Sequence, residues 1–254
     1  MRVVQRPLSL PTQHRGGLVV YSFPHLAEVG VDAFVTGREG GVSTGPYESL
    51  NLGTHVEDEF AAVVTNRSLV SHVVGAPLVI ARQVHGSTIL EGAEVEPGSE
   101  ADALVTRSSD LAVAVLVADC VPLVLVNPRR HELAVVHAGW RGMAAGIIEA
   151  TISRLGDPTE LLVGVGPSIS GAAYQVGPDV VGASPLFARH AREDGTDRSR
   201  LDLRACSADI VLAAGVASER LVVSTQVTDG GRNFFSDRTA RPCGRFALVA
   251  RWAS

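Results

Sequence analysis

The stretch LAVAVLVADCVPLVLV (111–126) is the longest apolar run in the chain and the one that decides its fold. It is interrupted by Asp119 and Pro122, so neither of its parts is long enough to cross a membrane as a helix. Two short apolar runs that are divided by a polar break are typical of two strands. The stretch therefore predicts one strand over 111–118 and a second over 122–127.

Similar runs surround this stretch. They predict further strands over 18–23, 32–36, 78–83, 101–106, 132–138, 160–166, 220–225 and 245–252. Apolar residues at helical spacing predict helices over 57–75, 139–156 and 203–215, and a long glycine-rich loop covers 37–53. Because few helical segments separate the central strands, their neighbours should be mostly antiparallel. We predict an α+β layered sandwich that forms a single domain over residues 1–254.

The composition excludes several classes of protein. Of the 254 residues, 46% are hydrophobic and 19% are charged, which is typical of a globular chain. The net charge of −5 does not favour a nucleic-acid polymer as partner. All 22 basic residues are arginine, which excludes a phosphate-loop NTPase and enzymes that form a lysine Schiff base. Any bound anion must be held by arginine, by backbone N–H groups or by a metal.

The cysteines indicate a reducing compartment. Cys120, Cys206 and Cys243 are odd in number and widely spaced, so a secreted disulfide framework is not expected. The sequence begins without a charged and then apolar leader, and none of its runs predicts a membrane span. We therefore expect a cytoplasmic protein with no membrane partner.

Three motifs place metal-ligating residue types where an apolar run meets a turn. They are RQVHGS (82–87) with His85, VADCVPL (117–123) with Cys120, and VVHAGWRG (135–142) with His137. Two imidazoles and a thiolate would form a three-ligand site with a vacant position, as in catalytic zinc centres. The alternative is a buried cysteine that packs as a small hydrophobe and histidines that are only hydrogen-bonded. The spacing matches no short-range zinc signature, so both interpretations stay open.

Together with TGREGGVSTGPYESLNLG (36–53), ADALVT (101–106) and VGVGPSIS (163–170), these motifs resemble the successive signatures of one family. This is the YfiH-like or laccase-domain (polyphenol oxidase) family, also described as multifunctional purine nucleoside phosphorylases. The resemblance covers residues 30–250 and leaves 1–17 as an extended N-terminal arm. It implies a four-layer α/β/β/α sandwich with mixed, largely antiparallel sheets.

The resemblance also implies an activity and a metal. His85, Cys120 and His137 occupy the positions of the family's metal ligands, which implies zinc, with copper as an alternative. The implied reactions are phosphorolysis of adenosine, inosine, guanosine and methylthioadenosine, and hydrolytic deamination of adenosine. The implied partners are purine nucleosides and inorganic phosphate. The sequence sets no oligomeric state.

Other residues are candidates for the chemistry of such a site. Cys120 and His137 are predicted to be catalytic, as is Asp119, which could move a proton or orient a ligand from beside Cys120. Arg141 lies near the start of the helix expected from Gly139 and is the first candidate for phosphate binding.

Three more residues are candidates for substrate binding, and two of them have a structural alternative. Arg38 lies in the glycine-rich loop and could bind phosphate or simply be solvated. Asn51 could bond to ribose or base, or could form an Asx turn. Gln83 is spaced to lie on the same face of a strand as His85.

Three other functions compete with the nucleoside chemistry. Cys120 and His137 could act as nucleophile and base of a cysteine hydrolase, which would not require His85. A factor that assists cell-wall (peptidoglycan) editing is a second alternative. A copper polyphenol oxidase is the third, although the eight histidines include no His-x-His pair. A single copper with Met143 as axial ligand would be a variant of it.

The C-terminal segment departs from the family pattern. The family has Phe-Phe-Ser-Tyr-Arg-Arg followed by Thr-Gly-Arg, whereas this chain has FFSDRTARPCGR (234–245). Asp237 replaces the aromatic residue and Thr239 replaces the second arginine, while Arg238 and Arg245 remain. We expect this segment to alter substrate range if it lines the site.

Overall fold

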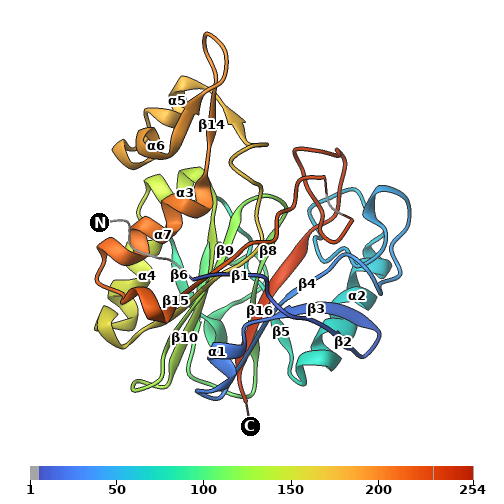
Figure 1. Cartoon of the computed structure of the whole chain (residues 1–254). Helices are drawn as coiled ribbons and strands as arrows, with labels where there is room; N and C mark the ends of the chain where they lie inside the picture. Colours follow the sequence, from blue (N-terminus) through green and yellow to red (C-terminus); the bar gives the residue numbers. More distant parts are fainter. Residues whose placement is uncertain (1–5, 231, 254) are drawn as a thin grey trace.

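The computed structural model describes residues 6–230 and 232–253, and its core is formed by two stacked sheets (Figure 1). The seven-stranded sheet has the order β1 (Arg6–Leu8), β15 (Leu221–Ser224), β11 (Leu162–Val165), β9 (Val121–Asn127), β10 (Glu132–Ala138), β7 (Ala103–Thr106) and β6 (Ile89–Glu91). The six-stranded sheet has the order β2 (Thr12–Arg15), β3 (Leu18–Ser22), β4 (Val31–Thr36), β16 (Phe246–Trp252), β8 (Ala112–Val117) and β5 (Leu78–Val79). A small third sheet joins β12 (Gln175–Val176), β14 (Ser199–Leu201) and β13 (Ala191–Glu193).

The central strands β8 and β9 are almost entirely apolar because both faces of each large sheet are buried there. In β8, Val113, Val115 and Val117 pack between the sheets, whereas Ala112, Ala114 and Leu116 pack on the outer face. In β9, Val124 and Val126 pack between the sheets, and Leu123 and Leu125 pack on the opposite face. This two-sided burial explains the unbroken apolar runs of the sequence.

Helices cover both outer faces. Helix α2 (Phe60–Val74) packs Val70 and Val74 on the six-stranded sheet, and it ends at Gly75, whose φ is 73°. The seven-stranded sheet is covered by α4 (Ile147–Leu155) and α7 (Leu203–Ala213), and α6 (Pro185–His190) packs against α7. The short helices are α1 (Pro24–Ala27), α3 (Trp140–Ala144) and α5 (Pro178–Val181). The architecture is thus the expected α/β/β/α sandwich, and its strand pairs are antiparallel except β1–β15, β11–β15, β6–β7 and β5–β8.

Local structure corrects several expectations. The helix predicted over 139–156 is two helices, because Gly146 adopts a φ of 81° between α3 and α4. The strand predicted over 78–83 ends at Val79, and the chain beyond it is irregular. The sequence analysis also missed β6 and the small third sheet, whose strands are three residues long at most.

The N-terminal arm that was expected over 1–17 is described from Arg6 onward, and residues 1–5 lie outside the described part. Strand β1 pairs with β15 in one large sheet, and β2 pairs with β3 in the other. In the two described ranges of the chain, no helix is both long and apolar enough to cross a membrane.

The turn between β8 and β9 joins the two large sheets. β8 belongs to the six-stranded sheet and β9 to the seven-stranded one, so the chain changes sheet over residues 118–120. Asp119 adopts a φ of 92° in this turn. On the neighbouring strand His137 is paired with Pro122, so the register brings the end of β10 beside Cys120.

Candidate metal centre

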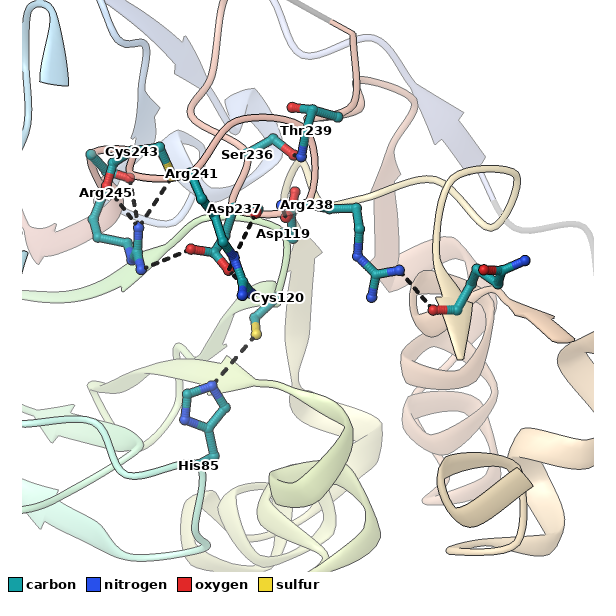
Figure 2. A network of polar contacts seen from close by, with 12 residues as sticks. His85, Asp119, Cys120, Ser236, Asp237, Arg238, Thr239, Arg241, Cys243 and Arg245 are labelled. Atoms are coloured by element: carbon teal, nitrogen blue, oxygen red, sulfur yellow. Dashed lines mark hydrogen bonds and ion pairs between the residues drawn. The ribbon is translucent and has the colours of Figure 1, made fainter. Parts of the chain in front are cut away.

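The structure brings the three predicted ligands together. One ligand atom from each of His85, Cys120 and His137 lies within 4.8 Å of the others. The Sγ of Cys120 is 3.9 Å from Nε2 of His85, as Figure 2 shows, and the two imidazole rings are perpendicular with centroids 4.7 Å apart. The cluster combines a turn between sheets, a strand end and the irregular segment after β5, so tertiary structure alone creates it.

A buried carboxylate, Asp102, positions both histidines. It accepts hydrogen bonds from the backbone N–H groups of Val84, His85 and Gly86 at 3.2, 3.0 and 2.7 Å. It also lies 2.8 Å from Nδ1 of His137, so that Nδ1–H donates to it and Nε2 is left for a metal. This arrangement fixes the segment of His85, whose φ is 60°.

Asp102 is not among the residues predicted for the site from the sequence, although the sequence contains a signal for it. The residue is the only charged one in ADALVT, and it is completely buried at the start of β7. A buried carboxylate must be paired, so its position next to an apolar strand was evidence for a nearby partner.

The electrostatics of the cluster favour a thiolate. Burial raises the pKa of the Cys120 thiol, but the imidazoles of His137 and His85 outweigh this effect and lower the pKa to about 6. Burial lowers the pKa of His137, but the Cys120 thiolate and the Asp102 carboxylate outweigh this effect and raise the pKa to about 9. The thiolate is the form of cysteine that binds metals and acts as a nucleophile.

The space around the donors also fits a metal. A Cβ on Gly139 would lie 2.9 Å from Cδ2 of His85 and 3.1 Å from the Cys120 Sγ, so the cluster requires glycine there. His85 is exposed, whereas His137 is buried, so the cluster opens to solvent on one side. Three N and S donors with one open side fit a zinc ion, and a copper ion shares the same donor preference.

Asp119 lies beside the cluster but uses its carboxylate to hold the chain. Oδ1 accepts from the Thr228 hydroxyl at 2.6 Å and Oδ2 from the Arg238 backbone N–H at 2.7 Å. The carboxylate thereby ties the C-terminal loop to the turn that carries Cys120. Its predicted catalytic role stays a prediction.

The glycine-rich loop uses Asn51 as its internal brace. The buried side chain donates to Gly53 O and to Asp58, and it accepts from the N–H groups of Gly53 and Arg245. These four bonds use its full capacity, so a contact with substrate would break one of them. This is the Asx-type alternative that the sequence left open.

Gln83 and Arg38 are also bound to the main chain. The Gln83 amide exchanges two hydrogen bonds of 2.7 Å with the backbone of Leu116 in β8. Arg38 donates from Nε and Nη2 to Glu48 O and stacks on Phe235. Both side chains thus brace the main chain, and a ligand role for either stays a prediction.

Two arginine–aromatic pairs are formed by residues of this region. Arg141 is exposed and lies over its neighbour Trp140. Arg238 lies over the ring of Tyr174. Burial, and after it the charge of Cys120, raises the pKa of Tyr174 to about 12. Tyr174 is therefore a neutral phenol, and the effect of Cys120 on it shows that the ring lies near the cluster.

The other sulfur atoms among the described residues lie in cores. Met143 is 3% exposed and packs in the cluster that α4 forms with the seven-stranded sheet, which favours packing over copper ligation. Cys206 is buried in α7, and burial raises its pKa to about 12. Cys243 is also buried, with a raised pKa, and contacts Arg245 through Sγ.

Comparison with known proteins agrees with this architecture. Residues 32–253 match the family described as multi-copper polyphenol oxidoreductase laccase. A purine nucleoside phosphorylase of Haemophilus influenzae is 39% identical over 239 residues, which cover 86% of this chain and 93% of that protein. One of Pseudomonas aeruginosa is 37% identical over 227 residues, which cover 86% and 92%.

Solved structures extend the similarity to the whole fold. YlmD from Geobacillus stearothermophilus superposes with a TM-score of 0.88 at 30% identity, covering 98% of this chain and 100% of that one. The protein NMB0706 of Neisseria meningitidis gives a TM-score of 0.86 at 35% identity, with 94% and 100% coverage. The chain therefore belongs to the YfiH-like, laccase-domain family that its motifs indicated.

Proposed function

We propose that this protein is a metal-dependent purine nucleoside phosphorylase that also deaminates adenosine. The observation that carries the proposal is the open cluster of His85, Cys120 and His137, with Asp102 fixing which nitrogen of His137 faces the centre. The names of its relatives support the phosphorylase activity. Adenosine, inosine, guanosine and methylthioadenosine are the proposed substrates, and inorganic phosphate is the proposed co-substrate.

The chain's own residues would prepare the centre before any substrate arrives. Cys120 supplies a thiolate near neutral pH, and Asp102 keeps His137 and the segment of His85 in place. A zinc ion held by these donors would supply Lewis-acid polarisation of a carbonyl oxygen or a water molecule. Copper is the alternative ion for the same donors.

Residues around the opening would bind the nucleoside. Tyr174 and Trp140 offer aromatic faces, on which a purine could stack. Arg141 and Arg38 remain proposed phosphate ligands, and Asp119 keeps the turn of Cys120 attached to the C-terminal loop. The proposed catalytic residues are Asp119, Cys120 and His137.

A cysteine hydrolase is the second candidate, because one observation favours it. The lowered pKa of Cys120 and the raised pKa of His137 would together give a thiolate and an imidazolium, the state of a cysteine nucleophile with its base. Such a pair requires neither His85 nor a metal. Dependence on both therefore separates the two functions.

The test is a product analysis with the purified, metal-quantified protein. Each of the four nucleosides is incubated with and without phosphate, and bases and nucleosides are separated by chromatography. The proposal predicts free base only with phosphate, and inosine from adenosine without it. Absence of both products from zinc- and copper-loaded protein would reject the proposal and favour the hydrolase.

A further inference from the structure

A cavity of about 570 Å³ lies against the C-terminal loop that departs from the family pattern. Its wall includes Tyr47 and Glu57 on one side and Asp237, Arg241 and Arg245 on the other. This volume is within the usual range of small-molecule sites. The function proposed above makes no use of these two arginines.

The loop that carries this wall is attached to the metal centre. The Arg238 N–H donates to Asp119, and Asp119 directly precedes Cys120. In Figure 2, Asp237, Arg241 and Arg245 lie on the side of Cys120 that is opposite His85. A ligand in this cavity would thus lie close to a nucleoside at the open centre.

The carboxylate of Asp237 lies between the two guanidinium groups. Nε of Arg241 donates to its Oδ2 at 2.7 Å, and Nη2 of Arg241 forms an ion pair with the same oxygen. Nη2 of Arg245 is 3.4 Å from its Oδ1. Two arginines that converge on one carboxylate have the geometry that also suits a phosphate.

The two arginines differ in how firmly they are held. Arg245 has a side chain that is 20% exposed, and its Nη1 donates to the carbonyls of Cys243 and Gly244 at 3.0 Å. Arg241 is 75% exposed, and within the described part of the chain its guanidinium bonds to Asp237 alone. An ion pair with so much exposure is easily exchanged, so Arg241 can change partner while Arg245 stays in place.

An anion that enters the cavity must compete with carboxylates of the wall for the two arginines. Two arginines face two carboxylates, those of Asp237 and Glu57, and the wall is therefore neutral. An anion gains two guanidinium partners only when it displaces the carboxylate of Asp237. Asp237 thus competes with a bound anion for the two guanidinium groups.

We propose that Arg241 and Arg245 form a subsite for inorganic phosphate, and that Asp237 fills it in the absence of the ligand. The inference rests on the proposed function and deepens it, because it places the phosphate co-substrate at Arg241 and Arg245 instead of at Arg141 and Arg38. Binding itself does not depend on turnover, so the two can be tested separately. The chemistry recognised is a tetrahedral oxyanion that accepts from two arginines.

The test is isothermal titration of inorganic phosphate into the metal-loaded protein and two variants. Arg241→Gln should weaken binding about tenfold, the effect of losing one charge-assisted hydrogen bond. Asp237→Asn should strengthen binding severalfold, because it removes the competing charge and keeps the shape. A purely structural role would weaken binding in both variants, so the opposite signs are diagnostic.

Two further variants serve as comparisons. Arg129 is 77% exposed, is paired with Glu160, and follows the end of β9 that is remote from Cys120. Arg129→Gln should therefore leave phosphate binding unchanged. Arg141→Gln tests the other phosphate candidate. Weaker binding in this variant, together with unchanged binding in Arg241→Gln, would overturn the inference.

The outcomes also separate the subsite from the proposed activity. Phosphate binding with the expected signs but without any nucleoside cleavage would retain the subsite and reject the phosphorylase. Phosphate-dependent cleavage with unchanged phosphate affinity in both Arg241→Gln and Asp237→Asn would retain the phosphorylase and reject the subsite.

Discussion

Two aspartates near the opening show how differently the same side chain can be used. Asp102 is completely buried, accepts from three backbone N–H groups and holds His137. Asp237 has a side chain that is 28% exposed and is paired with two arginine side chains, one of them mostly solvated. Buried hydrogen bonds thus hold the candidate metal centre in place, whereas the C-terminal loop forms a cavity wall whose ion pairs can exchange.

The largest expected effect is loss of the centre itself. Cys120→Ser removes the soft donor, so bound metal and nucleoside turnover should both fall to background. Cys206→Ser is the matched control, because this thiol is buried in α7 away from the cluster. Metal content by mass spectrometry and product formation by chromatography measure the two effects. Full activity of Cys120→Ser would refute a role for the cluster.

The second effect separates the two aspartates directly. Asp102→Asn removes the negative charge next to Nδ1 of His137 and weakens the hydrogen bonds that hold the backbone at His85. Metal affinity should therefore fall about 10- to 100-fold. Asp237→Asn should leave metal affinity within about twofold, because Asp237 contacts no ligand. Competition with a chelator of known affinity measures both. Equal losses would show that the loop is part of the centre.

Much of the fold was predictable because it rests on local apolar pattern. The runs around 111–127 and 132–138 are strands in the structure, and the helix ending at Gly75 is present. The error at 139–156 arises because Gly146 interrupts the helix without any change in the apolar pattern. Very short strands such as β12–β14 have too few residues to show a period.

The sequence predicts the candidate metal ligands only through their residue type and their position at the end of an apolar run. His85, Cys120 and His137 each follow an apolar run, and the structure brings them together. Asn51 and Gln83 were candidates for substrate binding, and they bond to Arg245 and Leu116, which are distant in sequence. A role of either in binding substrate stays a prediction. The sequence marks Asp102 as a charged residue beside an apolar strand, but its partner His137 depends on the register between β7 and β10.

A third, smaller effect tests the space at the centre. Gly139→Ala places a methyl group 3.1 Å from the Cys120 Sγ and 2.9 Å from the His85 ring, so metal affinity should fall roughly tenfold. Gly86→Ala is the control, since its Cβ would meet the Asp102 Oδ2 at an ordinary 3.6 Å. Chelator competition again provides the measurement, and a larger loss in Gly86→Ala would contradict the described geometry.

The smallest expected effect concerns the pH at which Cys120 becomes reactive toward alkylation, and its measurement requires no change in the fold. The pKa of Cys120 is lowered to about 6 by the facing imidazoles, against burial, so the thiolate predominates above that pH and is lost as the pH falls below it. In chelator-treated protein, alkylation of Cys120 should therefore level off above about pH 7. Cys206 and Cys243, with raised pKa values, are internal controls in the same peptide map. A Cys120 rate that rises steadily to pH 9 would contradict the ion pair.

The most direct test of the central claim is adenosine cleavage measured against bound metal. Samples with graded zinc content are incubated with adenosine and phosphate, and adenine is quantified. Adenine formation should rise in proportion to zinc, up to one ion per chain, and should require phosphate. Equal adenine formation by chelated protein, or none at full zinc occupancy, would contradict it.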